Sequence, residues 1–114
     1  MAFNDLELQR IKNSVGALCA RRSPEEFKDQ LRIDYEVDGH AVTIYENRPA
    51  WNKPEEWTRL GVARIRYTRT RNEWLLYWMR RDLKWHLYDP AEMSAGLEEL
   101  VRIVDEDEFG AFWG

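Results

Sequence analysis

The chain has 114 residues, a formal net charge of −4 and a single cysteine, Cys19. One cysteine excludes an intramolecular disulfide and a metal site built from cysteines. The acidic balance argues against a general nucleic-acid binder. A polar start and the absence of a long apolar run argue against a signal peptide and a membrane helix. We therefore expect one cytoplasmic domain over residues 1–114, without a membrane partner.

Charged and aromatic residues are distributed unevenly along the chain. The sequence has 6 Trp, so either the core is aromatic or some of these rings lie on a binding surface. Residues 58–88 contain eight basic and two acidic side chains, whereas residues 89–114 contain one basic and eight acidic ones. Either the two segments neutralise each other in the fold, or the basic segment binds an anion.

The first predicted element is a helix that begins at Asn4. Asn4 and Glu7 have the spacing of a capping box, and the helix should end near Arg22, before Ser23-Pro24 starts a second, short helix. Apolar residues recur at helical spacing along one face. That face is predicted to bury Leu8, Ile11, Val15, Leu18 and Cys19, with the cysteine acting as a small apolar side chain.

A hairpin should follow. Apolar and polar residues alternate over residues 31–37, which predicts a strand, and Asp38-Gly39 is a typical two-residue hairpin turn. Residues 48–58 contain two prolines and are expected to form a loop. The turn would set Tyr35 opposite Val42 and Ile33 opposite Ile44.

Three further strands are predicted over residues 60–68, 74–80 and 83–88, and a closing helix over residues 94–105. A turn around Thr70-Arg71 pairs Ala63 with Trp78 and Arg64 with Tyr77. A two-residue turn at Arg81-Asp82 would make Trp78 and Trp85 buried neighbours and set Tyr77 opposite His86. The closing helix should bury Leu97, Leu100, Val101 and Val104.

This order of elements predicts the fold class. We expect an α+β fold with a curved, five-stranded antiparallel meander sheet and N-terminal and C-terminal helices packed on one face.

Several segments resemble a known family. They are Gln30-Leu31-Arg32, Arg48-Pro49-Ala50-Trp51, Tyr77-Trp78-Met79-Arg80, Asp82-Leu83-Lys84-Trp85-His86 and the tail over residues 104–114. The family comprises small bacterial proteins catalogued as a domain of unknown function, numbered three thousand and twenty-four. The resemblance implies a stand-alone bacterial cytosolic protein, and it implies no activity, cofactor or catalytic residue.

The face of the sheet that points away from the helices carries the candidate binding site. Arginine, lysine, histidine and tyrosine side chains in adjacent rows suit a flat, anionic ligand such as single-stranded nucleic acid. We therefore hypothesise a non-catalytic binding or adaptor domain, whose partner could also be a protein. The alternative is an ordinary solvated face. The candidate residues are Arg64, Arg66, Tyr77, Lys84, His86 and Tyr88.

An enzyme is the second hypothesis, although no nucleophile elbow or phosphate loop is present. The acidic run from Asp105 to Glu108 could hold a metal ion and support a metal-assisted hydrolase, with Asp105, Asp107 and Glu108 as ligands. The same carboxylates could instead pair with basic strands of the chain or remain solvated.

The aromatic tail is the last informative feature. Burial of Phe109, Phe112 and Trp113 would be worth about 1.5–3 kcal/mol each, so we predict that residues 109–113 dock on the domain. Docking would carry the acidic run over Arg80, Arg81 or Lys84. The alternative is an exposed tail that binds a partner.

Overall fold

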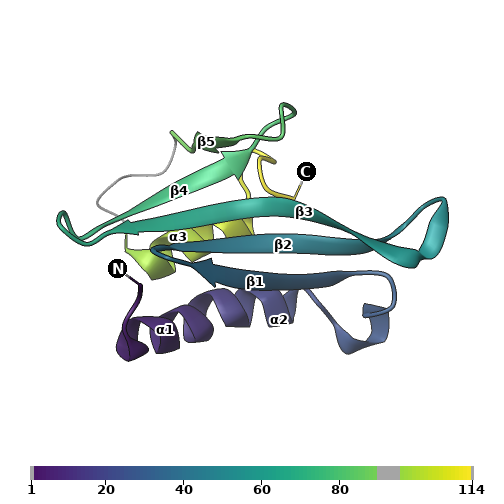
Figure 1. Ribbon diagram of the computed structural model, residues 1–114, viewed down its shortest axis with the longest axis horizontal. Helices are drawn as coiled ribbons and strands as arrows, with labels where there is room; N and C mark the ends of the chain where they lie inside the picture. The colour runs from purple at the N-terminus through teal and green to yellow at the C-terminus, as the bar shows by residue number, and fades with distance from the viewer. Residues whose placement is uncertain (1, 90–95, 114) are drawn as a thin grey trace.

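Figure 1 shows the computed structural model, which describes residues 2–89 and 96–113. The N-terminal helical run consists of α1 (Asp5–Ile11), the π-helical segment η1 (Lys12–Gly16) and α2 (Ala17–Arg21), and a short 3-10 helix, η2 (Glu25–Phe27), follows. The strands are β1 (Arg32–Asp38), β2 (Ala41–Ala50), β3 (Lys53–Thr68), β4 (Glu73–Met79) and β5 (Trp85–Leu87), and the last helix is α3 (Leu97–Glu106). Ser94, where the sequence predicts that helix to begin, lies outside the described residues.

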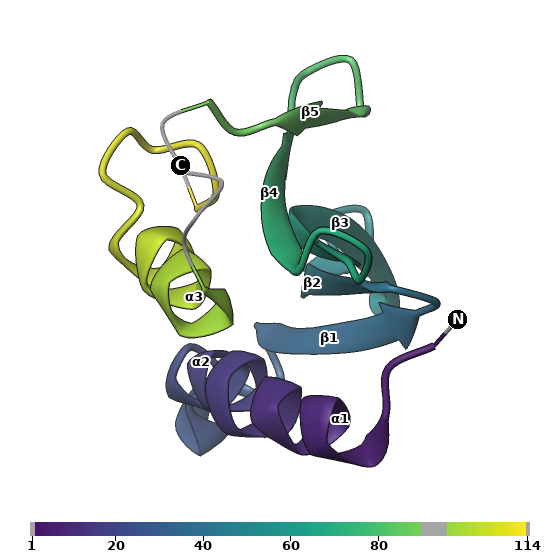
Figure 2. The ribbon, with the colours of Figure 1, turned by 90° about the vertical axis from the view of Figure 1, so that its left-hand side faces the viewer.

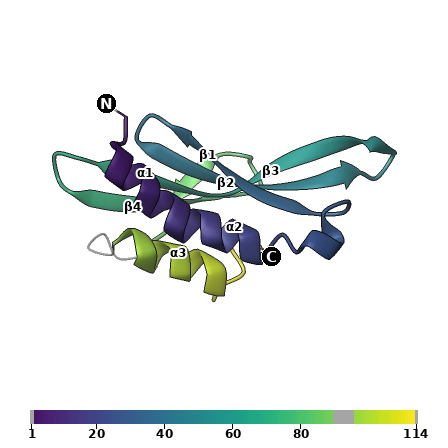
Figure 3. The ribbon, with the colours of Figure 1, turned by 90° about the horizontal axis from the view of Figure 1, so that it is seen from below.

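The strands form one antiparallel sheet in the order β1-β2-β3-β4-β5. The α+β class and the five-stranded meander are therefore as predicted. Figure 2 shows that the sheet curves from β1 to β5, with α3 inside the curve. Helix α2 contacts β1, and α3 contacts β3 and β4. Seen from below, the N-terminal helical run and α3 lie side by side (Figure 3).

The first helix starts at the predicted cap. The Asn4 side chain accepts the Glu7 backbone N–H at 2.8 Å, and the Glu7 carboxylate accepts the Asn4 N–H at 2.9 Å, which completes the capping box. The prediction for Leu8 is wrong, because its side chain is 38% exposed. Phe3 packs here instead, with its ring stacked 5.8 Å from that of Trp74.

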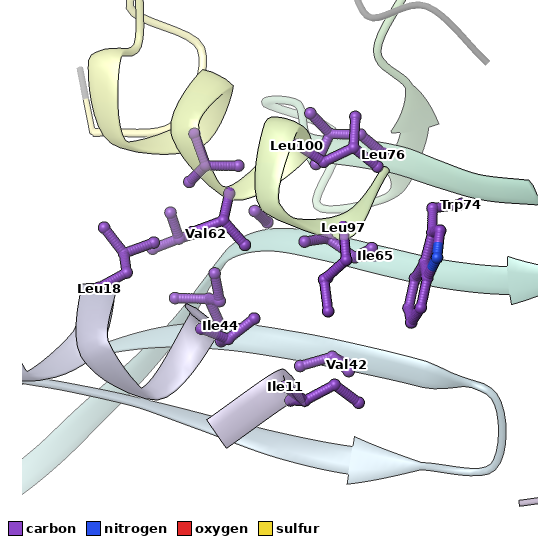
Figure 4. Close-up of a cluster of buried hydrophobic side chains, with 14 of the residues drawn as sticks. Ile11, Leu18, Val42, Ile44, Val62, Ile65, Trp74, Leu76, Leu97 and Leu100 are labelled. Carbon is purple, nitrogen blue, oxygen red and sulfur yellow. The ribbon is translucent and has the colours of Figure 1, made fainter. Parts of the chain in front are cut away.

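The core joins the helices to the sheet (Figure 4). Ile11 and Leu18 lie on the N-terminal helical run, Ile44 and Ile65 lie on adjacent strands, and all four are fully buried. Burial of each such side chain stabilises the fold by about 1.5–3 kcal/mol. The remaining predicted helical core residues are also buried, namely Val15, Cys19, Leu97, Leu100, Val101 and Val104.

The first hairpin has a different register from the one predicted. Tyr35 pairs with Ile44 and Ile33 with Glu46, so the pairs Tyr35–Val42 and Ile33–Ile44 are wrong by two residues. The turn consists of Gly39 and His40, and Gly39 has a positive φ of 59°. Gly39 thus takes the first turn position rather than the second. A shift of two residues leaves every side chain on its expected face.

Residues 48–58 are not a loop. β2 continues to Ala50, β3 starts at Lys53, and Pro49 pairs with Trp57. β1 pairs with β2 only as far as Asn47, so Pro49 lies on an edge, where a missing N–H is tolerated. The hairpin projects beyond the helices (Figures 1 and 3), and Trp51 at its tip is 93% exposed.

The predicted register is correct for the β3–β4 pair and wrong for the β4–β5 pair. Between β3 and β4, Ala63 pairs with Trp78 and Arg64 with Tyr77, as predicted. Between β4 and β5, however, Trp78 pairs with His86 and Met79 with Trp85. Trp78 and Trp85 therefore project from opposite faces, and their expected contact in the core is wrong.

The β4–β5 connection explains this difference. It is longer than the two-residue turn expected at Arg81-Asp82, since the Leu83 N–H donates to the Arg80 carbonyl at 2.9 Å and Leu83 adopts a φ of 62°. The Asp82 carboxylate accepts the Lys84 N–H at 3.0 Å. This larger turn shifts the pairing by one residue, which exchanges the two faces of β5.

Candidate functional site

Three of the predicted binding residues share the outer face of the sheet. Arg64 pairs with Tyr77 and Arg66 with Leu75, as the sequence predicts. Ala63 and Ile65, which alternate with the arginines, are fully buried. The arginine side chains therefore point away from the core, and directly opposed residues lie about 4.5–5.5 Å apart.

The other three predicted residues do not join that row. His86 pairs with Trp78 on the inner side of the sheet, where its Nε2 lies 2.8 Å from an Asp82 carboxylate oxygen. Tyr88 is only 5% exposed and packs 4.9 Å from the Phe112 ring. Lys84 lies in the exposed β4–β5 turn. The one-residue shift of β5 moves the histidine off the predicted face.

Trp85 takes the place of His86 on the outer face. A Cβ atom on Gly61 would lie 2.8 Å from the Trp85 ring and 3.3 Å from the Met79 methyl group, so the Trp85 ring lies directly against β3 at Gly61. Sequence analysis missed this residue, although a glycine within a strand is itself a signal of close approach. We call the resulting surface the outer patch. It comprises Arg64, Arg66, Leu75, Tyr77, Met79 and Trp85.

The acidic end of the chain does not neutralise the basic strands. Asp105 pairs with Arg21 at 3.3 Å and with Arg22 at 3.2 Å, and Glu98 pairs with Arg10 at 2.6 Å. Glu98 and Asp105 of α3 therefore bind the N-terminal helical run and the residue that follows it, whereas Glu99 and Glu106 pair with Arg102 within α3. Within residues 2–89 and 96–113, no carboxylate forms an ion pair with Arg64, Arg66, Arg71, Arg80, Arg81 or Lys84.

Part of the tail docks as predicted, but Asp105 of the acidic run pairs with other arginines than those predicted. Phe112 is buried, and the Trp113 indole N–H donates to the Val104 carbonyl at 2.8 Å. The Arg22 guanidinium lies 4.0 Å from the centre of the Trp113 ring. Phe109 does not dock, since it is 67% exposed. The predicted contacts of the acidic run with Arg80, Arg81 or Lys84 are replaced by those with Arg21 and Arg22.

Two carboxylates of the acidic run, those of Asp105 and Asp107, form contacts that hold the C-terminal part of the chain in place. Asp107 ends α3 in the left-handed conformation, with φ 45°, and its carboxylate accepts the backbone N–H groups of Phe112 at 3.0 Å and Trp113 at 2.8 Å. Asp105 is occupied by the arginine pairs, and Glu108 is exposed. In the described part of the chain, no three potential ligands lie close enough to hold a metal ion.

Two titratable groups bear on possible chemistry. Desolvation raises the pKa of the buried Cys19 thiol to about 12, so this cysteine is an inert core residue rather than a nucleophile. The hydrogen bond from His86, followed by that from the Lys84 N–H, lowers the pKa of Asp82. Asp82 is therefore a charged carboxylate that orients the His86 ring.

Comparison with known proteins gives a family but no activity. No helix in the described ranges has the length and hydrophobicity that crossing a membrane requires. No curated protein and no solved structure matches the chain. A family model described as a domain of unknown function, DUF3024, matches residues 3–114. The match spans almost the whole sequence, and the chain therefore belongs to the DUF3024 family.

Proposed function

We propose that the protein is a non-catalytic binding domain that holds a flat, anionic ligand on the outer patch, and that this ligand is single-stranded nucleic acid. The proposal rests on one observation: Arg64 and Arg66 have no carboxylate partner among the described residues, and they share the outer patch with the rings of Tyr77 and Trp85. No described helix covers this face (Figure 2). Arginines would bind phosphates while the rings stack on bases. We also propose a bacterial, cytoplasmic location, as the family resemblance implies.

A metal-assisted hydrolase at the acidic run is less well supported than binding at the outer patch. Its candidate ligands Asp105 and Asp107 already bind arginines and backbone N–H groups. The outer patch, by contrast, leaves both guanidinium groups available to a ligand.

Binding of short, mixed-sequence single-stranded DNA and RNA tests the proposal. Affinity should fall as salt rises, because each neutralised phosphate releases counterions. The double variant Arg64→Ala, Arg66→Ala should reduce the slope of log K against log salt by about 0.7 for each lost phosphate contact. Tyr77→Ala should weaken binding by about 1–3 kcal/mol through lost stacking.

The matched control removes two exposed arginines elsewhere. Arg48 pairs with Glu46, and Arg102 pairs with Glu106. The variant Arg48→Ala, Arg102→Ala changes the net charge equally and should keep most of the affinity. The proposal is wrong if the wild type binds no oligonucleotide at low salt, or if the control loses as much affinity as the patch variant.

A further inference from the structure

A groove separates the β4–β5 hairpin from the C-terminal tail. It consists of three adjoining open cavities of about 500, 670 and 260 Å³, and Arg80 and Ala111 line all three. Trp78 and Gly110 line the two larger ones. Of the outer patch, Met79 also lines the cavities of about 670 and 260 Å³. The other members of the outer patch, including Arg64 and Tyr77, line none of the three cavities.

The groove combines a free cation with aromatic walls. The Arg80 guanidinium lies 5.4 Å from the centre of the Trp78 ring, and no carboxylate among the described residues forms an ion pair with it. His86 also lines the cavity of about 500 Å³, and its Nε2 lies 2.8 Å from an Asp82 carboxylate oxygen. Phe109 contributes a second, exposed ring to the same cavity.

These groups match one class of ligand. A guanidinium binds carboxylate or phosphate through charge-assisted hydrogen bonds, and aromatic side chains favour a flat ring beside them. Among the described residues, no serine, threonine or cysteine lines the cavities, so this part of the chain offers binding without an obvious nucleophile.

We propose that this groove is a second binding site, which takes a small organic anion with a flat ring and a carboxylate or phosphate group. Arg80 binds the anionic group. Trp78 and Phe109 contact the ring, and the ring of His86, held by Asp82, forms part of the wall. This site shares Met79 with the outer patch, but none of the residues proposed to bind phosphates or bases there.

Titration of the full chain with benzoate, phenyl phosphate and benzyl alcohol, followed by NMR, tests this proposal. The two anions should shift the Trp78 indole N–H and Arg80 side-chain resonances and saturate, whereas the neutral alcohol should bind at least about tenfold more weakly. Tighter binding of benzoate identifies a carboxylate site, and tighter binding of phenyl phosphate identifies a phosphate site.

Substitutions test whether the anions bind in the groove. Arg80→Gln should weaken anion binding about tenfold or more, and Phe109→Ala should weaken it by a smaller factor. Arg48→Gln and the outer-patch variant Arg64→Ala, Arg66→Ala should leave it unchanged. The proposal is overturned if neither anion shifts these resonances, if the alcohol binds equally well, or if Arg80→Gln binds as tightly as the wild type. None of these results depends on whether oligonucleotides bind.

Discussion

Gly61 of β3 lies against the Trp85 ring. An added Cβ atom would lie 2.8 Å from two ring carbons, closer than van der Waals contact allows. Gly16 offers the opposite case, because a Cβ there would meet the Tyr35 ring at an ordinary 3.5 Å. Gly16 also has helical backbone angles, φ −60° and ψ −40°. Gly61 therefore has a steric reason to be glycine, whereas the contacts and the backbone angles of Gly16 would accept an alanine.

Alanine substitution at these two positions should have opposite effects on the free energy of unfolding. Gly61→Ala should lower it by about 1–3 kcal/mol through overpacking against Trp85. Gly16→Ala should raise it by about 0.5–1 kcal/mol, because alanine loses less backbone entropy in a helix. Urea denaturation measures both values. A neutral Gly61→Ala variant would mean that Trp85 does not lie against β3.

At the scale of elements, the C-terminal tail behaves as a short docked segment rather than a free end. Asp107 stops α3 and accepts two tail N–H groups, at 3.0 and 2.8 Å. Phe112 is 7% exposed and packs against Tyr88, and Arg22 lies over the Trp113 ring. These contacts tie the tail to α2, α3 and the segment that follows β5, and they leave Phe109 at the surface.

Two phenylalanines of the tail provide a matched pair of variants. Phe112→Ala should lower the free energy of unfolding by about 3–5 kcal/mol, because it creates a cavity. Phe109→Ala should change it by less than about 0.5 kcal/mol, since that ring is exposed. Thermal and urea unfolding test both. Equal effects of the two substitutions would contradict the docked arrangement, as would an unchanged melting temperature after deletion of residues 109–114.

Across the whole molecule, ion pairs connect the helices to each other and to a turn of the sheet. Arg10 on α1 binds Glu98 on α3 through two hydrogen bonds of 2.7 and 2.6 Å. Arg69, in the β3–β4 turn, binds Glu7 on α1 at 2.8 Å. The hydrogen bond from Arg10 is the main reason why the pKa of Glu98 is lowered. The hydrogen bond from Arg69 is likewise the main reason why the pKa of Glu7 is lowered. Both carboxylates are therefore more acidic in the folded chain than in the unfolded one.

This difference predicts how stability depends on pH. A carboxylate with a lowered folded pKa stabilises the fold fully above its unfolded value, here 4.5, and that stabilisation is lost as the pH falls through the folded pKa. Glu98→Gln should lower the melting temperature near neutral pH by a few degrees at most, because this exposed pair is worth about 0–1 kcal/mol.

The effect of Glu98→Gln should shrink towards zero as the pH falls well below 4.5. Glu55→Gln, on the exposed β2–β3 hairpin, provides the control and should change little at any pH. Melting curves across this pH range would contradict the assignment if the effect of Glu98→Gln stayed constant or grew in acid.

Local chemistry in the sequence determines much of this fold. The Asn4–Glu7 spacing fits the cap of the first helix, the alternation of apolar residues predicts the strands, and the spacing of Leu97, Leu100, Val101 and Val104 predicts the buried side of α3. These features depend on residues a few positions apart. For the same reason, Arg64 opposite Tyr77 could be predicted from alternation and a plausible turn.

The tertiary structure decides which side chains meet across the β4–β5 turn. Leu83 adopts a positive φ of 62°, which is unfavourable for a leucine in isolation, and nothing nearby in the sequence signals it. The resulting one-residue shift moves His86 inward and Trp85 outward. Side chains alternate between the two faces of a strand, so the two-residue shift at Gly39 leaves every side chain on its expected face. A one-residue shift, as in β5, moves every side chain to the other face. The residues of both proposed sites therefore depend on strand pairing, which is a non-local property.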